Sequence, residues 1–329
     1  MEELLENVVS NTLDGTNDFV EVVVADNGST DGSIDFLKDR FPDTVRIIDL
    51  KHNHGFAEGY NLALTQVESD YVVMLNSDVE VTHGWLRTLT DFMDNNPDVA
   101  ACQPKIRSLR QRKMFEHAGA AGGFIDRLGY PFCRGRIMDM VEEDKGQYDD
   151  PIDLFWATGA CLCIRLDDYR ASGELDARFF AHMEEIDLCW RLRSRGRRIV
   201  CIPQSCVYHL GGATLKKDNP QKTFLNYRNN LLMLYKNLPS GKFMPIFVAR
   251  FFMDYLSAFI FLLSGKFVDA RAVCRARKSF YEMCPHFTTQ RLENIQSAKL
   301  TDIPQIYKGS MILGYYLFGK RKFGDFFNS

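Results

Sequence analysis

The sequence has 329 residues, of which 46% are apolar and 25% are charged, and its formal net charge is −3. This length and apolar content suffice for one large α/β domain with an appended region. The small net charge gives no reason to expect a nucleic acid as a partner. The nine cysteines follow no metal-binding or disulfide spacing, which favours a reducing cytoplasm.

Helical and strand patterns alternate along the first two thirds of the chain. Helices are predicted at residues 1–12, 31–40, 56–67, 83–94 and 184–195, and strands at 19–25, 45–50, 71–75, 98–104, 154–164, 198–202 and 206–209. This alternation predicts an α/β fold with a mostly parallel sheet and helices on both of its faces. Residues 105–150 follow no regular pattern, and such a long segment inside a compact domain is often functional.

The most informative segment is FVEVVVADNGSTDGS at residues 19–33. Its valine-rich run predicts a strand buried on both faces, and this run ends at Asp26. Asn27-Gly28 predicts a turn, and Ser29, Thr30 or Asp31 can cap the helix that follows. Ligands of open α/β sheets bind beyond the carboxyl ends of the strands, where Asp26 can accept hydrogen bonds from a base or a ribose. Taken alone, a surface turn capped by an aspartate is an equally good interpretation.

A second strand, Tyr71–Leu75, repeats this design and ends in a triplet with Asn76 and Asp78. Carboxylate and amide oxygens at such a strand end suit Mg²⁺ or Mn²⁺, which in turn hold a diphosphate. Between the two strands, the segment HNHGFAEGYNLAL supplies Gly55, which lets the backbone approach a ligand, and Asn61 on the following helix.

These three pieces, in this order, resemble the family 2 glycosyltransferases, which are nucleotide-sugar enzymes of the GT-A fold, most of them inverting at the anomeric carbon. Three later segments extend the resemblance: FWATGACLCIR (155–165), FFAHMEEIDLCWRLRSRG (179–196) and VYHLGGAT (207–214). Within the family, the sequence is most similar to the rhamnosyltransferase-like branch, which carries a similar Asn-x-Asp metal motif. The resemblance implies a Rossmann-like GT-A domain followed by a C-terminal helical region.

The resemblance also implies roles for the acidic cluster of the second of these segments. Glu185 corresponds to the family's catalytic base and Glu184 to the carboxylate before it, whereas Asp187 is expected to stabilise the start of the helix. Crowded carboxylates drive their pKa values apart, which can leave one of them poised as a base. A helix whose first turn is merely acidic is the alternative for this cluster.

Further roles follow for the donor site. Asp78 is the first candidate for the metal ligand, and His209 is expected to complete the metal or diphosphate site. Trp156 and Gly159 are expected to line the floor of the sugar pocket, and Arg191 either reaches a phosphate or pairs with a nearby carboxylate. The residues predicted to bind the nucleotide sugar are Asp26, Asn27, Gly28, Ser29, Gly55, Asn61, Asn76, Trp156, Gly159 and Arg191.

The sequence departs from the family's pattern at its beginning. Family members open with an apolar strand that ends in Tyr-Asn or Trp-Asn, whereas this sequence opens with MEELLENVVSNTL, which predicts the helix that follows that strand. Either the sequence begins late or the protein is a degenerate copy. On this ground we expect weak or absent activity from the chain, because the missing strand forms one wall of the nucleotide pocket.

The last third of the sequence has a different character, and we predict a transferase domain at 1–215 and a helical region at 216–329. Residues 243–263 are almost continuously apolar and long enough to span a bilayer, but they contain Arg250 and Asp254. Central charges are costly in a membrane, and basic residues flank the segment. An interfacial helix on anionic lipid is therefore the preferred interpretation, and a hairpin packed on the catalytic domain is the alternative.

The leading hypothesis is a metal-dependent, inverting glycosyltransferase that uses Mg²⁺ or Mn²⁺. Its partners would be a nucleoside-diphosphate sugar, a lipid-linked or polysaccharide acceptor and the cytoplasmic face of the membrane, with which it would associate peripherally. A nucleotidyltransferase is a second possibility, because such enzymes also use Rossmann-like sheets and paired metal ligands. A non-catalytic paralogue that binds a partner or lipid is the third.

Overall fold

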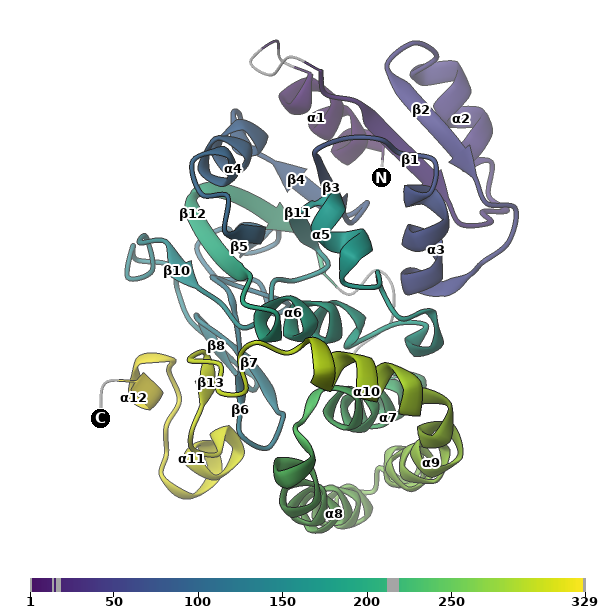
Figure 1. The fold of residues 1–329 in the computed structure, drawn as a ribbon. Helices are drawn as coiled ribbons and strands as arrows, with labels where there is room; N and C mark the ends of the chain where they lie inside the picture. The colour runs from purple at the N-terminus through teal and green to yellow at the C-terminus, as the bar shows by residue number, and fades with distance from the viewer. Residues whose placement is uncertain (1, 14, 16–18, 212–218, 328–329) are drawn as a thin grey trace.

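The computed structural model describes all residues except 1, 14, 16–18, 212–218 and 328–329 (Figure 1). Helices and strands alternate in the first third of the chain, as predicted. Their bounds are α1 (Glu2–Thr12), β1 (Val22–Asp26), α2 (Ser33–Arg40), β2 (Val45–Asp49), α3 (Gly55–Leu64), β3 (Tyr71–Leu75), β4 (Val79–Val81), α4 (Trp85–Asp94) and β5 (Val99–Ser108). The predicted boundary between residues 215 and 216 lies outside the described residues.

The central sheet has six strands in the order β10-β12-β5-β11-β3, with β4 paired to β12. The added strands are β10 (Ile152–Asp153), β11 (Cys161–Arg165) and β12 (Arg198–His209). β12 runs parallel to β5, but β11 runs antiparallel to both β3 and β5, so the sheet is more mixed than predicted. The predicted strand 154–164 begins only at Cys161, because the chain turns where the Cys161 amide donates to the Thr158 carbonyl.

Helices cover both faces of this sheet. α4 packs on one face through Trp85, Leu89 and Met93, and α6 (Glu184–Ser194) packs on the other through Ile186 and Leu188. Between them, β5 is buried along most of its length. This two-sided burial explains why its sequence is apolar without alternation.

β1 and β2 form a parallel two-stranded sheet of their own. Their register pairs Asp26 with Asp49, so both strands end at the same edge. Within the described residues, no strand joins β1 to β3, and the predicted single parallel sheet is divided into two parts at this point.

The segment 105–150, for which no regular structure was predicted, contains most of a third sheet. Its strands are β6 (Gly123–Asp126), β7 (Pro131–Cys133), β8 (Arg136–Ile137) and β9 (Met140–Val141). The C-terminal strand β13 (Ile306–Tyr307) joins this sheet parallel to β6, and Phe323 of the C-terminal tail stacks near Phe124. The C-terminal region therefore packs on the transferase domain.

The other C-terminal elements are α7 (Pro220–Asn237), α8 (Ser240–Leu263), α9 (Phe267–Met283), α10 (Thr288–Ser297), α11 (Met311–Leu317) and α12 (Gly324–Phe327). α7 begins at Asn219, whose side chain accepts a hydrogen bond from the Gln221 amide, with Pro220 in the first turn. α9 packs along both α7 and α8, and α8 lies at the far end of the molecule from β1 and β2 (Figure 1).

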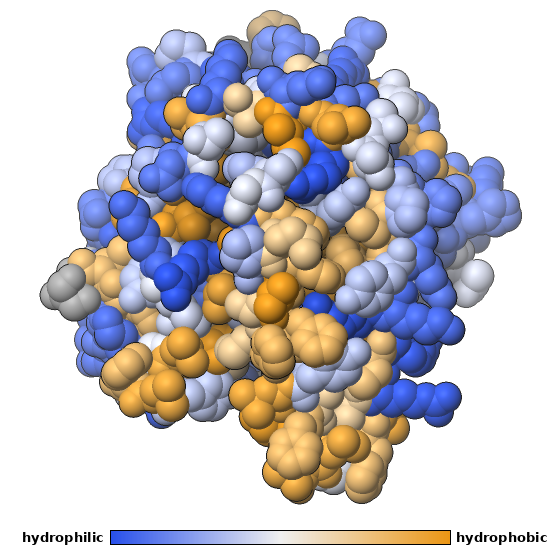
Figure 2. Space-filling view, turned by 60° about the horizontal axis from the view of Figure 1, so that its bottom comes forward, coloured by the Kyte–Doolittle hydropathy of each residue, from blue (hydrophilic) through white to orange (hydrophobic). Residues whose placement is uncertain are grey.

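α8 buries Arg250 and Asp254 and exposes many of its apolar residues. Its buried residues are Arg250, Asp254 and Ala258. Arg250 Nε donates to Asp254 Oδ1 at 3.2 Å, and Arg277 of α9 donates to Asp254 Oδ2 at 2.9 Å. The exposed apolar side chains of this helix are Met244, Val248, Phe251, Phe252, Tyr255, Leu256, Phe259, Ile260, Leu262 and Leu263. They form part of the apolar surface in the lower part of Figure 2.

Candidate functional site

The turn after β1 is held by Asp26. This carboxylate is buried, and its Oδ2 accepts hydrogen bonds from the amides of Gly28 (3.1 Å) and Ser29 (3.0 Å). Gly28 has φ +83°, and a Cβ there would lie 2.7 Å from the backbone of His52, so only glycine fits. The polar turn that the sequence predicts at this strand end is present, and its backbone geometry is tightly determined.

Asn27 ties this turn to the start of α3. Its Nδ2 donates to the Gly55 carbonyl at 2.9 Å, and its Oδ1 accepts from the His54 amide at 2.9 Å. Gly55 has φ +79°, and a Cβ there would collide with the ring of Phe180. The Phe56 amide donates to the Phe180 carbonyl at 2.8 Å. The start of α3 therefore brings the β1 turn together with the segment that precedes α6.

The second predicted cluster forms a direct contact across the sheet. Asp78 follows β3, His209 ends β12, and His209 Nε2 lies 2.9 Å from Asp78 Oδ1. Asn76 Nδ2 lies 3.5 Å from the same nitrogen. Burial would raise the pKa of Asp78, but the hydrogen bond from His209 lowers it below its ordinary value. The structure therefore brings together the three side chains that the sequence predicts for the metal or diphosphate.

Glu116 is a member of this cluster that sequence reasoning missed. Its Oε2 lies 3.4 Å from His209 Nδ1, opposite Asp78, and the Ala118 amide donates to the same oxygen. Burial would lower the pKa of His209, but the two carboxylates raise it to about 9. Glu116 lies in the irregular segment 105–150, and no local pattern marks it. Its contact with His209 spans almost a hundred residues and appears only in the folded chain.

The segment before α6 is held in an unusual backbone conformation. Phe180, His182 and Met183 all have positive φ values, 65°, 69° and 74°. Such non-glycine residues cost free energy, and they cluster at functional sites where the surrounding structure holds them. Asn229 of α7 provides that hold, because its buried Nδ2 lies within 3.0 Å of the carbonyls of Phe179, Ala181 and His182.

Glu184 and Glu185 follow this segment at the start of α6. The Oε2 atoms of both are enclosed and have no hydrogen-bond partner among the described residues. Burial raises the pKa of Glu185 to about 7, and burial together with the neighbouring Glu185 raises the pKa of Glu184 well above its usual range. Cys189, one turn after Glu185, contacts the Ala157 amide, so this face of α6 looks toward the segment 157–159. Two enclosed carboxyl groups with raised pKa values form a suitable acid–base pair.

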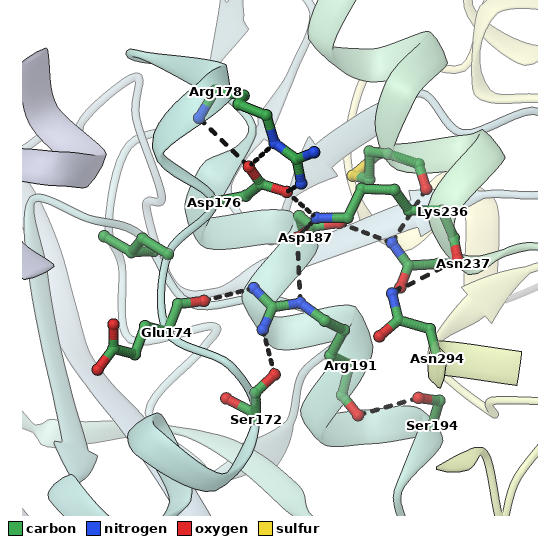
Figure 3. Close-up of polar contacts among 12 residues, drawn as sticks. Ser172, Glu174, Asp176, Arg178, Asp187, Arg191, Ser194, Lys236, Asn237 and Asn294 are labelled. Carbon is green, nitrogen blue, oxygen red and sulfur yellow. Dashed lines mark hydrogen bonds and ion pairs between the residues drawn. The ribbon is translucent and has the colours of Figure 1, made fainter. Parts of the chain in front are cut away.

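Asp187 belongs to a buried ion network and has no exposed area. It accepts from Arg191 Nε at 3.1 Å, from Lys236 Nζ at 2.7 Å and from Asn237 Nδ2 at 2.7 Å (Figure 3). Arg191 also donates to the carbonyls of Ser172 and Glu174. Of the two roles predicted for Arg191, the structure shows the pairing with a carboxylate. Neither Asp187 nor Arg191 is free to contact a substrate, and both hold α6 in place.

Asn61 and Trp156 have structural contacts as well. Asn61 Nδ2 donates to the Leu175 carbonyl at 2.8 Å, and its Oδ1 accepts from the Tyr169 hydroxyl. Trp156 is buried, and its indole nitrogen donates to the Phe124 carbonyl at 2.8 Å. These two side chains are therefore held by contacts within the fold, and Asn61 also lines a cavity beside α6.

Gly159 lies between the start of α3 and the end of β3. A Cβ there would lie 3.0 Å from the ring of Phe56 on α3, and the neighbouring Ala160 carbonyl accepts from the Asn76 amide at 3.1 Å. The start of α3, the end of β3 and the turn before β11 therefore converge. The carboxylate–histidine pair lies beside this point of convergence, because Asn76 and Asp78 both follow β3.

Comparison with protein-family models shows that residues 1–148 match Glycosyl transferase family 2. The N-acetylglucosaminyl-diphospho-decaprenol L-rhamnosyltransferase of Mycobacterium tuberculosis is 26% identical over 234 residues, which are 65% of this chain and 74% of that protein. The resemblance to the family 2 glycosyltransferases is confirmed over these 148 residues, and the protein is a glycosyltransferase. The rhamnosyltransferase WbbL of Escherichia coli is 22% identical to this transferase over 163 residues, which are 47% of the chain and 61% of WbbL.

Solved structures agree with this assignment at the level of the fold. GalNAc-T7, crystallised with UDP, GalNAc and Mn²⁺, superposes on the transferase with a TM-score of 0.55 at 14% identity, covering 71% of this chain and 45% of its own. The GT-A fold predicted from the motif order is therefore confirmed.

Proposed function

We propose that this transferase moves a sugar from a nucleoside-diphosphate sugar to a hydroxyl of a lipid-linked or polysaccharide acceptor, with inversion and with the help of a divalent cation. The observation that carries the proposal is the pair of enclosed carboxyl groups, Glu184 and Glu185. Their helix contacts Ala157, and the nearby Ala160 carbonyl accepts from Asn76 beside the Asp78–His209 contact. An L-rhamnosyltransferase whose name states a diphospho-decaprenol acceptor is among its relatives, which favours a lipid-linked acceptor of cell-envelope synthesis.

The side chains present fit a divalent cation. Mg²⁺ is usually held by one or two protein ligands together with substrate phosphates, with ligand distances of about 2.0–2.1 Å. Asp78 and His209, which lie in contact, would hold the ion, and His209 would bind it after losing the proton that it shares with Asp78. No three His, Cys, Asp or Glu side chains of the described part of the chain form a complete cage, as expected if the diphosphate supplies the other ligands. When bound, the ion would stabilise the negative charge of the departing diphosphate.

Glu185 is the proposed base. Its raised pKa lets it hold a proton near neutral pH, and its place on the face of α6 toward residues 157–159 directs it at the donor pocket. Burial and the neighbouring Glu185 raise the pKa of Glu184 well above its usual range, so Glu184 stays protonated where Glu185 titrates. In the proposed reaction, Glu185 takes the proton from the acceptor hydroxyl while that oxygen attacks the anomeric carbon opposite the leaving group.

Donor binding tests this proposal directly. A panel of nucleoside-diphosphate sugars is titrated into the protein by calorimetry, with Mn²⁺ and then with EDTA. We expect at least one donor to bind in Mn²⁺ and to be released by EDTA. The anomeric configuration of the transferred sugar, measured by NMR, then reports inversion. If no donor binds in the presence of Mn²⁺, the assignment of this site is wrong.

We also propose that the enzyme works at the inner face of the membrane. α8 is the one helix in the described part of the chain whose length and composition would allow it to cross a bilayer. Its buried Arg250 and Asp254 bind it to the protein body, since Arg250 also donates to the Leu128 carbonyl at 3.0 Å. Such an anchored helix suits docking on lipid better than spanning it. Exposed basic residues on and beside the hairpin suit anionic lipid, namely Lys242, Lys266, Arg271, Arg275 and Lys278.

Vesicle sedimentation tests the membrane proposal. We expect the protein to pellet with vesicles containing phosphatidylglycerol at low salt and to be released at high salt, because salt screens surface charge. The double variant Phe252→Ser, Phe259→Ser removes two exposed rings of α8 and should stay in the supernatant. Leu292→Ser, at an exposed apolar residue of α10, is the matched control and should pellet normally. If the parent protein stays in the supernatant at low salt, the apolar face binds something other than lipid.

A further inference from the structure

A cavity of about 450 Å³ opens beside the second half of α6. Its walls come from α6 and the following Arg195, from α7, α10 and the segment 170–178, and from Asn61 of α3. Asp78, His209, Glu184 and Glu185 are not among its lining residues. Its charged lining residues are Arg170, Asp176, Arg178, Arg191, Arg195, Lys236 and Glu293. The cavity is therefore distinct from the proposed donor site, although α6 contributes to both.

The buried ion pairs at the base of this cavity contain more positive than negative charges. Three cationic side chains, Arg178, Arg191 and Lys236, share the carboxylates of Asp176 and Asp187 (Figure 3). Lys236 Nζ lies 2.7 Å from an oxygen of each carboxylate, and Arg178 lies 2.8 Å from Asp176. Buried charges are normally paired, so the extra positive charge creates a demand for an anion.

Arg170 and Arg195 also line the cavity and add two positive charges. Among the lining residues, Glu293 is the one further carboxylate. Arg195 Nη1 donates to the Ala171 carbonyl at 2.7 Å, but its Nε is enclosed and has no hydrogen-bond partner among the described residues. Burial, followed by the nearby Arg191, lowers the pKa of Arg195. Backbone carbonyls solvate several of these cations but carry no net charge, so five cations face three carboxylates.

We propose that this cavity binds a phosphate-bearing small molecule, with Arg195 as its principal ligand. A phosphate carries close to two negative charges near neutral pH, which would compensate the excess. The planar guanidinium group suits phosphate oxygens, and the volume lies in the range of small-molecule sites. The proposal does not depend on the transfer reaction, because none of the proposed metal or base residues contributes to the cavity.

Inorganic phosphate and pyrophosphate are suitable probes. They are titrated by calorimetry in EDTA, at an ionic strength held constant with sodium chloride, and thermal melting is followed in parallel. We expect saturable binding and a higher melting temperature for the parent protein. Asp78→Ala should bind the probes equally well, which separates the cavity from the diphosphate site.

Two variants with opposite effects make the test specific. Arg195→Gln should weaken binding about ten-fold or more, since a hydrogen bond to a charged group is lost. Glu293→Gln should strengthen binding, because it removes a competing negative charge, and a damaged fold would not produce that result. Arg197→Gln is the matched control, because Arg197 pairs with Asp168 and does not line the cavity. Binding that is unsaturable, or equal in the parent and in Arg195→Gln, would overturn the proposal.

Discussion

Lys236 of α7 donates a hydrogen bond to Asp187 of α6 at 2.7 Å, and neither side chain is accessible to solvent. This contact fixes the helix that carries the proposed base against the C-terminal helical region. Asn229, two turns earlier on α7, holds the segment in front of the same helix. The C-terminal region is therefore part of the support of the active site.

The first prediction concerns this contact. Lys236→Met should lower the free energy of unfolding by about 1–3 kcal/mol, because buried oxygens of Asp176 and Asp187 each lose a hydrogen-bond donor. Urea unfolding measures the change. Lys278→Met is the control, since Lys278 forms an exposed pair with Glu282 and should change stability by less than about 1 kcal/mol. Equal effects of the two variants would contradict the structural role of the network.

The second prediction concerns the metal. Asp78→Ala should abolish Mn²⁺-dependent binding of the donor, measured by calorimetry, while the melting temperature shows that the protein remains folded. Glu80→Ala is the matched control, because this neighbouring carboxylate pairs with Arg112 on the surface. Donor binding by Asp78→Ala that still responds to Mn²⁺ would show that another residue holds the ion.

The third prediction concerns Glu116, which contacts Nδ1 of His209 on the side opposite Asp78. Partners that orient a metal-ligating histidine typically contribute about 10–100-fold to metal affinity. Glu116→Ala should therefore weaken Mn²⁺ binding by about that factor, measured by the electron paramagnetic resonance signal of the free ion. Glu116→Asp should recover part of the loss. If Glu116→Ala binds Mn²⁺ like the parent, then His209 needs no orienting partner.

The fourth prediction concerns the base. Glu185→Gln should lower kcat about 10²–10⁴-fold, because the loss of a general base has an effect of this size. Donor affinity should hardly change, since the substitution keeps the shape of the side chain. Glu184→Gln provides the comparison on the same helix. If that variant is the inactive one and Glu185→Gln remains active, the two carboxyl groups have the opposite roles.

The pH dependence provides the fifth prediction. Burial raises the pKa of Glu185 from 4.5 to about 7, so the group is neutral in the folded protein below this pH and charged above it. Because a base must be charged to accept a proton, kcat/KM should rise with pH through about 7. The same group ionises more readily in the unfolded chain, so its contribution to stability falls as the pH rises from about 4.5 to about 7. Glu185→Gln should remove both effects, and a profile that stays flat through pH 7 would exclude Glu185.

The features that the sequence predicts correctly depend on short segments. The strand ends at Asp26 and Asp78 follow directly from apolar runs that stop at polar residues, and the order of the motifs predicts the GT-A fold. Glu116 escapes prediction because its partner, His209, lies far away in the chain. Asn61 and Asp187 lie in motifs from which a functional role was predicted. In the folded chain, Asn61 instead bonds to Leu175 and Asp187 to Lys236, and the sequence alone does not show these contacts.

The interpretation of α8 shows the same limit. The sequence shows that residues 243–263 are apolar with two charges four residues apart, and either an interfacial helix or a packed hairpin satisfies this pattern. In the structure, one face of α8 packs on the protein and the opposite face is apolar and exposed. The packed face is held by the hydrogen bond that Arg277 of α9 donates to the buried Asp254. Which face turns inward depends on this partner from the next helix.

The division of the sheet between β1 and β3 affects how the donor pocket can move. The β1 turn is joined to the rest of the site by side-chain and loop contacts such as Asn27 with Gly55, and no described strand ladder links it to the six-stranded sheet. Separating β1 and β2 from the six-stranded sheet would therefore break few backbone hydrogen bonds. Amide protons of β1 should exchange with solvent at a lower opening free energy than those of β5.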